Sequence, residues 1–251
     1  MPFFTADLHL HTVLSACAEG EMLPEFIIER AGELGLDIIA VTDHNSCENA
    51  AAMIRAAEGT SIDVWPGMEV QSREEAHLLC LFDTLDQALA WQEVVYASLP
   101  PLKNRPSVFG EQVVLASDGE PVGTNDRLLA TSTFLSVEEV VRGVSHLGGL
   151  CIPAHVDRPM YSLIANLGFI PPDLAIPGVE VSHLLGPKEA RARFPQLARY
   201  GLIADGDAHR LGEMCRRNTL KMAHRTTAEL AWALAGVGDR GVWVDGVRTT
   251  P

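Results

Sequence analysis

The stretch that decides the fold is residues 3–11, Phe-Phe-Thr-Ala-Asp-Leu-His-Leu-His, a strand-like apolar run that ends in an acid and two histidines. Other apolar runs along the chain also carry an acid or a histidine at one end. These residues are Asp43 and His44 after Leu36–Thr42, Glu69 after Ile62–Pro66, His77 before Leu78–Phe82, His155 after Leu150–Ala154, and Asp207 and His209 after Leu202–Ala204. The carboxyl ends of strands in a parallel α/β protein converge on one face, so the pattern predicts a single shared site.

Helix signals alternate with the strand-like runs. Ser136 with Glu139, and Thr226 with Glu229, are spaced as capping boxes for two predicted helices. Repeated βα units indicate an α/β fold with a mostly parallel sheet that closes into a barrel or a distorted barrel. One such barrel fills 251 residues, so we expect a single domain over residues 1–251. The proline- and glycine-rich segment 100–133 is expected to be an insertion or lid within it.

Composition and charge narrow the classes of partner. The chain has 33 acidic and 19 basic side chains, and its formal charge of −14 opposes approach to nucleic-acid backbones. We therefore expect a small substrate and no long nucleic acid. No apolar stretch is long enough to span a membrane, and no basic-then-apolar leader opens the chain, so we expect a cytoplasmic protein without a membrane partner. Nothing in the sequence indicates an oligomeric state.

The residue types at the strand ends are those that bind divalent metals. In an extended strand His9 and His11 point to the same side, with Asp7 placed to orient an imidazole. Taken singly, such residues are equally well explained as hydrogen-bonded core histidines, or, for Asp43 and His44, as turn and surface residues. Independent strands would rarely all end in ligand-type residues, so the repetition favours a metal site.

The same motifs, in sequence order, resemble those of the polymerase and histidinol phosphatase (PHP) superfamily. They are Asp-Leu-His-Leu-His-Thr at 7–12, Thr-Asp-His-Asn at 42–45, Pro-Gly-Met-Glu at 66–69, His77, Pro-Ala-His at 153–155 and Asp-Ala-His at 207–209. The resemblance implies a distorted (β/α)7 barrel. It also implies a centre of two or three divalent metal ions, at the C-terminal ends of the strands, that hydrolyses phosphoesters.

By this resemblance one ion is held by His9, His11, Glu69 and Asp207. Glu69 bridges to a second ion held by His77 and His155, and His44 with His209 holds a third. Zinc, manganese and iron all accept such histidine and carboxylate ligands.

The third site departs from the family pattern. Many relatives place a histidine or aspartate shortly after the His-x-His motif, where this chain has Val13-Leu14-Ser15-Ala16-Cys17. Cys17 is either a thiolate ligand, which would favour zinc, or a small buried thiol, in which case the site depends on water or Glu19. The five cysteines are widely spaced without a C-x-x-C pair, so we expect reduced thiols.

The implied activity is that of a metal-dependent phosphoric ester hydrolase. Its substrate would be a phosphomonoester or phosphodiester of a small metabolite, nucleotide or short oligonucleotide, attacked by a metal-activated hydroxide. Asp7 and Asp43 would orient ligands, and Arg158 and Arg210 would contact phosphate unless they are solvated or ion-paired. The alternatives are a non-catalytic metal-binding regulatory module and, within the enzyme class, a histidinol-phosphate phosphatase. His183 could face the site, but it matches no ligand motif, so we expect it to be structural.

Overall fold

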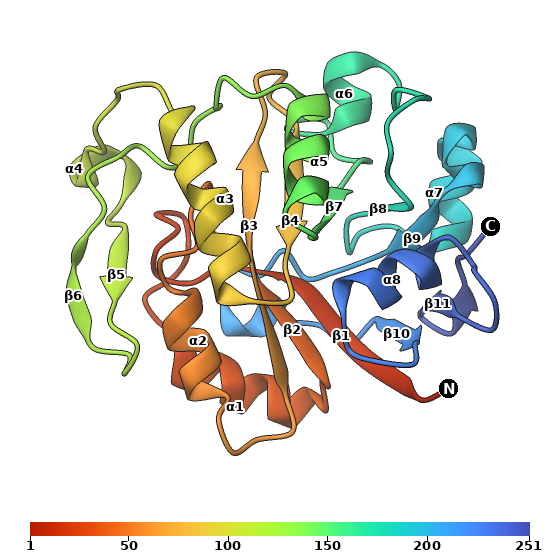
Figure 1. Ribbon diagram of the computed structural model, residues 1–251, viewed down its shortest axis with the longest axis horizontal. Coiled ribbons are helices and arrows are strands. Elements are labelled where there is room, and N and C mark those ends of the chain that lie inside the picture. Colours follow the sequence, from red (N-terminus) through yellow and green to blue (C-terminus); the bar gives the residue numbers. More distant parts are fainter.

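The computed structural model describes all 251 residues, and its centre is a curled eight-stranded sheet (Figure 1). In spatial order the strands are β12 (Val247–Arg248), β11 (Gly241–Val244), β10 (Asn218–Lys221), β1 (Phe3–Leu10), β2 (Ile38–Val41), β3 (Asp63–Gln71), β4 (His77–Leu81) and β7 (Leu150–Pro153). A separate parallel pair, β8 (Gly178–Glu180) and β9 (Gly201–Ile203), contacts β7 on one side and β11 on the other. The strands therefore enclose a distorted barrel, and the predicted α/β fold class is confirmed.

The sheet is mixed, whereas we expected it to be mostly parallel. Within it only the β1–β2 and β2–β3 pairs are parallel, and β4 runs antiparallel to both β3 and β7. Because β4 is reversed, its first residue, His77, pairs with Gln71 at the carboxyl end of β3. The reversal thus brings a residue that opens its strand to the same end of the barrel as the residues that close theirs.

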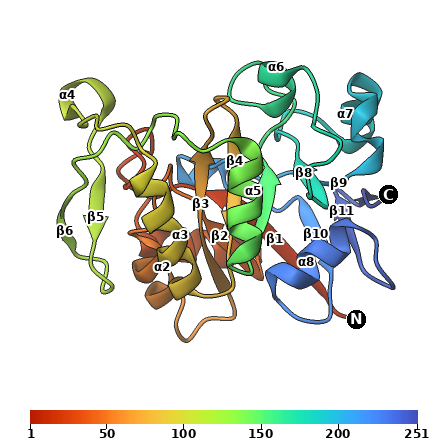
Figure 2. The same ribbon diagram turned by 45° about the horizontal axis from the view of Figure 1, so that its top comes forward.

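Helices cover the outside of the sheet and one end of the barrel (Figures 1 and 2). The outer helices are α1 (Pro24–Leu34), α2 (Ala50–Ala56), α3 (Leu85–Ala97) and α5 (Val137–His146), while α8 (Thr227–Leu234) packs across the strands β7, β9, β10 and β11. Shorter helices lie in the connections that follow β7, β8 and β9. They are α6 (Leu163–Leu167), α7 (Pro187–Arg193), η1 (Pro195–Arg199) and η2 (Leu211–Glu213).

Successive residues of the strands pack alternately into two separate apolar cores. In β2, Ile38 and Ala40 face the barrel interior, whereas Ile39 and Val41 face the outer helices. The outer core is the larger, with 42 buried residues against 17 inside. Because these strands are buried on both faces, their sequences are continuous apolar runs. Packing on both faces also holds in position the strand ends that carry the polar residues.

Segment 100–133 forms a short helix, α4 (Pro106–Phe109), and a hairpin of β5 (Val113–Leu115) and β6 (Pro121–Thr124) at one edge of the molecule (Figure 2). The Asn49 side chain bonds to both Val113 and Leu115 of the hairpin, and Asn45 donates to the carbonyls of Leu129 and Thr131. Its role as a lid and the single-domain organisation stay predictions. None of the helices has the length and apolar character needed to cross a membrane.

Candidate metal centre

Glu69, near the carboxyl end of β3, lies in the middle of a cluster of histidines and is 1% exposed. Its two carboxylate oxygens face different histidines. Oε1 lies 2.8 Å from His77 Nδ1, 3.1 Å from His155 Nε2 and 3.3 Å from His9 Nε2, and Oε2 lies 3.0 Å from His44 Nδ1 and 3.6 Å from His11 Nε2. A carboxylate placed in this way can bridge two cations.

Asp207 provides a second buried carboxylate from the loop after β9. Its Oδ1 lies 3.2 Å from Nε2 of both His9 and His11. Asp207 and His155 have φ values of 46° and 27°, in the left-handed region that non-glycine residues seldom adopt. Strained backbone of this kind is found at functional sites, where the surrounding structure holds it in place.

The donor set fits divalent metal ions. Three groups have ligand atoms within 4.8 Å of one another: His9, His11, Glu69 and Asp207; His44, Glu69 and His77; and His11, His44 and His209. His9 Nε2 and Glu69 Oε2 are buried without a hydrogen-bond partner. Such orphaned atoms are costly unless a ligand satisfies them, and a mixture of imidazole and carboxylate donors is one that zinc, iron and manganese accept.

Burial and neighbouring charges shift the pKa values of the side chains at the centre. Burial opposes ionisation of Glu69, but the neighbouring histidines, His77 and His9 foremost, hold its carboxyl pKa well below the usual range. Burial also opposes protonation of His9, yet Asp207 and Glu180 raise its pKa well above normal. For His11, burial and the charge of His209 lower the pKa. The cluster therefore holds side chains of opposite charge close together in a buried region.

Comparison with known proteins identifies the family. A family model described as PHP domain matches residues 7–149, more than half of the chain. The chain belongs to the PHP domain family. This membership confirms the resemblance seen in the motifs and agrees with the predicted enzyme class, a metal-dependent phosphoric ester hydrolase. No curated protein matches the chain in sequence.

Solved structures share the PHP fold at low sequence identity. Endonuclease Q from Pyrococcus furiosus, a lesion-specific endonuclease, has a TM-score of 0.67 and 20% identity over 96% of this chain. Endonuclease Q in complex with a 27-mer duplex containing an abasic lesion has a TM-score of 0.65 and 20% identity over 95%. The chain spans 58% of the length of each. A protein from Bifidobacterium adolescentis assigned as a metal-dependent phosphoesterase has a TM-score of 0.54 and 21% identity, with 82% of this chain and 88% of that one covered.

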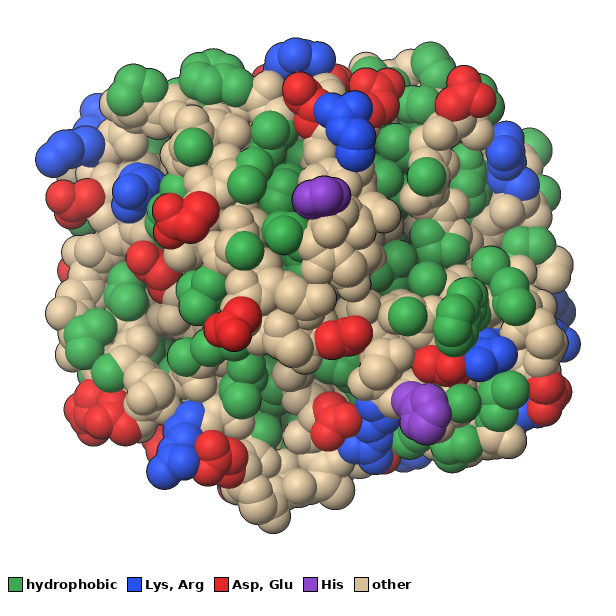
Figure 3. Space-filling model, in the orientation of Figure 1, with side chains coloured by type: hydrophobic (Ala, Val, Ile, Leu, Met, Phe, Trp, Pro, Cys, Tyr) green, Lys and Arg blue, Asp and Glu red, His purple; other side chains and the backbone are tan.

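These neighbours correct one expectation, that long nucleic acid is excluded as a partner. A chain with this fold binds a 27-mer DNA duplex at its active site, so the exclusion drawn from net charge was wrong. Net charge sums over the whole surface, whereas binding depends on the local field at the site, to which bound cations contribute. Figure 3 shows acidic and basic side chains interspersed on one face of the molecule, without a continuous basic area.

The PHP site contains two residues that the sequence pattern did not reveal. Glu180, 1% exposed at the end of β8, lies 3.0 Å from His9 Nδ1 and accepts the backbone N–H of His155 at 2.7 Å. The Ser15 hydroxyl lies 2.9 Å from His11 Nδ1 and donates to Asp43 at 2.7 Å. Neither residue carried the signal of an acid or histidine that closes an apolar run, because Glu180 stands between two valines and Ser15 is a lone serine.

Asp43 and Asp7 therefore have different surroundings. Asp43 reaches His11 through Ser15, in keeping with the orienting role expected of it. Asp7 hydrogen-bonds to no histidine, contrary to expectation, and accepts the N–H groups of Gly206 and Cys215. The cause is a bulge: the three residue steps from Asp7 to Leu10 in β1 oppose two steps in β2, which interrupts the alternation. Burial raises the pKa of Asp7 to about 6.

The two predicted phosphate-binding arginines also differ. Arg158 makes an ion pair with Oδ2 of Asp207, on the opposite oxygen from His9 and His11. Arg210 is 58% exposed and pairs with Glu213 one turn further along, at 3.1 Å, so the structure does not bring it to the cluster. His183 is exposed and belongs to none of the ligand groups.

Cys17 lies at the rim of the centre, beside His44 and His209. Partial desolvation opposes ionisation of the thiol, but hydrogen bonds with His209 and His44 lower its pKa to about 6. Cys17 is exposed at the surface, which excludes the buried-thiol alternative, and all five cysteines are free as expected. Glu19 is exposed, and its backbone N–H bonds to the carbonyl of His209.

Proposed function

We propose that the protein is a metal-dependent phosphoesterase whose centre is built around Glu69. The observation that carries this proposal is the division of the Glu69 carboxylate between two sets of histidines. One ion would be held by His9, His11, Glu69 and Asp207, and a second by Glu69, His77 and His155, with His44 at their side. His44, His209 and the Cys17 thiol would hold a third ion, of which zinc, iron or manganese is the candidate metal.

Each protein residue has a separate task in this proposal. When bound, the metal ions would supply an ionised water and neutralise charge on the phosphoryl group. Glu180 fixes the ring of His9 through Nδ1, which leaves Nε2 directed at Glu69 and Asp207. Arg158, 32% exposed beside Asp207, is the guanidinium placed to contact a phosphoryl oxygen. Burial of the histidine cluster excludes bulk water, which strengthens these interactions.

The substrate is a phosphomonoester or phosphodiester, and the family alone does not distinguish them. The similarity to endonuclease Q extends over nearly the whole chain but covers only 58% of that enzyme. A substrate panel should therefore hold aryl phosphates, phosphorylated metabolites, short oligonucleotides and duplex DNA with and without an abasic site. The cytoplasmic location stays a prediction.

The decisive experiment measures hydrolysis of 4-nitrophenyl phosphate and bis(4-nitrophenyl) phosphate by protein loaded with zinc, manganese or iron. We expect turnover with at least one metal and its loss, by a factor of at least about 100, in Glu69→Ala. Glu25→Ala, an exposed acid of α1, is the matched control and should retain full activity. Undiminished hydrolysis by Glu69→Ala would refute the bridging role. No hydrolysis of any panel substrate with any metal would favour a binding module instead.

A further inference from the structure

A cavity of about 370 Å³ adjoins the proposed metal centre. It lies between the segment after β7, the segment after β8, α6 and the junction of α7 with η1. Arg158 belongs to both places, because it lines the cavity and makes an ion pair with Asp207. Val156, also in the lining, directly follows His155. A group attached to a phosphoryl at the centre would therefore find this cavity next to it.

The walls of the cavity are mainly apolar and its free charge is positive. Ile164, Leu184 and Phe194 are among the apolar residues that line it. The one acid in the lining, Asp157, accepts hydrogen bonds of 2.6 Å from both the N–H and the hydroxyl of Ser182, so its charge is satisfied locally. Arg193 is exposed, forms no ion pair and lies with its guanidinium 5.4 Å from the centre of the Phe194 ring.

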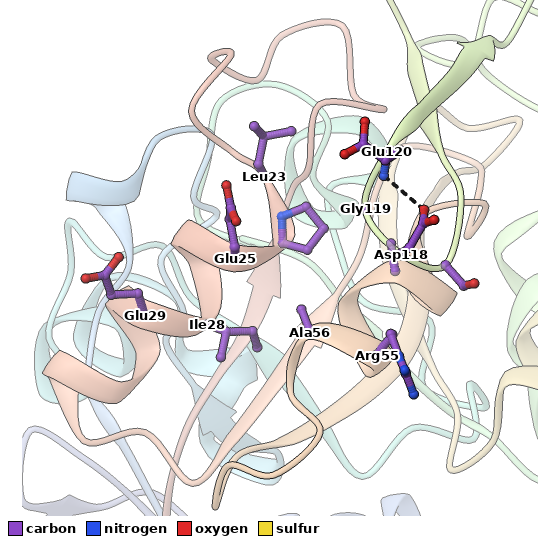
Figure 4. A pocket seen from close by; sticks show the side chains of 12 residues that line it. Leu23, Glu25, Ile28, Glu29, Arg55, Ala56, Asp118, Gly119 and Glu120 are labelled. Atoms are coloured by element: carbon purple, nitrogen blue, oxygen red, sulfur yellow. Dashed lines mark hydrogen bonds between the residues drawn. The ribbon is translucent and has the colours of Figure 1, made fainter.

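A larger cavity elsewhere in the protein has the opposite character. It measures about 610 Å³ and is lined by acids of α1 and the β5–β6 turn, among them Glu25, Glu29, Asp118 and Glu120 (Figure 4). Arg55, which also lines this cavity, is paired with Glu58. None of its lining residues belongs to the histidine cluster. An acidic surface repels phosphorylated compounds, so size alone does not mark the substrate cavity.

We propose that the cavity beside Arg158 binds the leaving group of the substrate, and that this group is an apolar body carrying a second acidic function that Arg193 binds. The inference rests on the proposed phosphoesterase function and specifies its substrate class. A volume of about 370 Å³ suits a small organic group, and apolar walls with few polar residues are usual for such sites. Arg193 offers planar donors to a carboxylate or phosphate while its face stays on Phe194.

Binding of two non-hydrolysable probes, phenylphosphonate and 4-carboxyphenylphosphonate, tests the proposal by calorimetry on manganese-loaded protein. We expect the carboxylated probe to bind more tightly, and Arg193→Gln to weaken it about tenfold while phenylphosphonate changes less than about twofold. Arg199→Gln is the matched control, because Arg199 lies in η1 outside the cavity, and it should alter neither affinity. Equal affinities for the two probes, or equal losses in Arg193→Gln, would overturn the proposal.

A second variant tests the cavity itself. Ala165→Trp, at an exposed lining position of α6, should weaken both phosphonates about tenfold and leave inorganic phosphate unchanged. Unchanged phosphonate binding would place the leaving group elsewhere. Hydrolysis of phenyl phosphate, measured in parallel, reports on the proposed function alone. If the protein binds the probes as described but hydrolyses no substrate, the proposed phosphoesterase function is contradicted. The assignment of the cavity as the binding site of the organic group is then retained.

Discussion

Glu180 contacts two of the predicted ligands at once, through the ring of His9 and the backbone of His155. A carboxylate in this position fixes the tautomer of a metal-binding imidazole and increases its basicity. It also satisfies the His155 N–H at a point where the backbone has positive φ. The affinity of the centre for metal should therefore depend on a residue that is not itself expected to bind the ion.

Glu180→Gln should lower metal affinity by about 10- to 100-fold, because the amide is a weaker partner for His9 than the carboxylate. Competition of the protein with a chromogenic chelator for zinc measures this change. Glu189→Gln, in the first turn of α7, is the control and should bind zinc like the wild type. Equal zinc affinities in wild type and Glu180→Gln would show that the contact with His9 does not tune the site.

Asp7→Asn should act on stability instead. The carboxylate of Asp7 accepts two backbone N–H groups, of which an amide oxygen can replace only one, so we expect the free energy of unfolding to fall by about 1–3 kcal/mol. Zinc affinity should stay within about threefold of the wild type. Urea unfolding of the metal-free protein measures the first effect and chelator competition the second. A loss of affinity as large as that of Glu180→Gln would restore Asp7 to the orienting role.

The sequence predicted the histidines and two carboxylates of the cluster because each one stands at the end of an apolar run. Their convergence follows from strand direction alone. Glu180 was not predicted because its strand is only three residues long and the acid stands between Val179 and Val181, so it does not close an apolar run in the sequence. The position of Asp7 could not be predicted, because a bulge changes which side chains share a face and leaves no mark in the alternation of residue types.

Among the elements, α5 begins as predicted. Ser136 accepts the N–H of Glu139, and the Glu139 side chain accepts the N–H of Ser136, which completes the capping box. The helix packs four valines, Val137, Val140, Val141 and Val144, against the sheet. The cap therefore fixes the start of an element that supports β4 and β7, the strands next to His77 and His155.

Ser136→Ala should lower the free energy of unfolding by about 1 kcal/mol, because the N–H of Glu139 loses its partner. Ser145→Ala, at an exposed position of the same helix, should change stability by less than about 0.5 kcal/mol. Urea unfolding followed by circular dichroism compares the two variants. Equal effects would mean that the capping box does not stabilise α5.

The start of α8 differs from the prediction in one respect. Thr226 accepts the N–H of Glu229, but the Glu229 carboxylate bonds to the N–H of Ala223 and to Arg240 instead of completing a box. Arg240 comes from the turn before β11, which the sequence could not place beside this helix. Its guanidinium, with the Ala223 N–H, lowers the pKa of Glu229 to about 2 against the opposing effect of burial.

The stabilising effect of Glu229 should therefore depend on pH. A carboxyl whose pKa is lower in the folded than in the unfolded state stabilises the fold above the unfolded pKa, here about 4.5, and loses this effect as the pH falls towards 2. The difference in unfolding free energy between wild type and Glu229→Gln should be constant above pH 5 and shrink below it. Glu93→Gln, exposed on α3 without a basic partner, is the control. A difference that grows on acidification would contradict the ion pair.

At the scale of the whole molecule, the fold class was predicted correctly, whereas the direction of β4 was not, although the sequence contained the information needed to predict it. The apolar run Leu78–Phe82, preceded by His77, was interpreted as strand-like. The strand observed there, β4, is separated from β3 by residues 72–76 alone. A parallel crossover needs roughly a dozen residues, so this short link already required an antiparallel hairpin. Membership of the PHP family confirms the family implied by the motifs, whereas the exclusion of long nucleic acid, drawn from net charge, was wrong.

Metal removal should destabilise the entire fold, because the centre joins residues from β1, β3, β4 and the segments after β2, β7 and β9. An ion present at about 100 times its dissociation constant adds about 2.7 kcal/mol, which for a chain of this size corresponds to a fall in Tm of roughly 5–10 °C after chelation. Differential scanning calorimetry with and without a chelator measures the shift. Glu69→Gln should show a much smaller one, and an unchanged Tm in the wild type would argue against a bound structural cation.

Glu69 is carried by β3, the longest strand, which is paired on both edges, while Arg158 and Arg193 stand in connections at the rim. Such an arrangement makes the molecule modular. Rim segments can be exchanged for those of a relative with different selectivity, and the strands that carry the carboxylate need not readjust. Grafting of the connections after β7 and β8 is therefore the natural route to redirect this scaffold towards new esters.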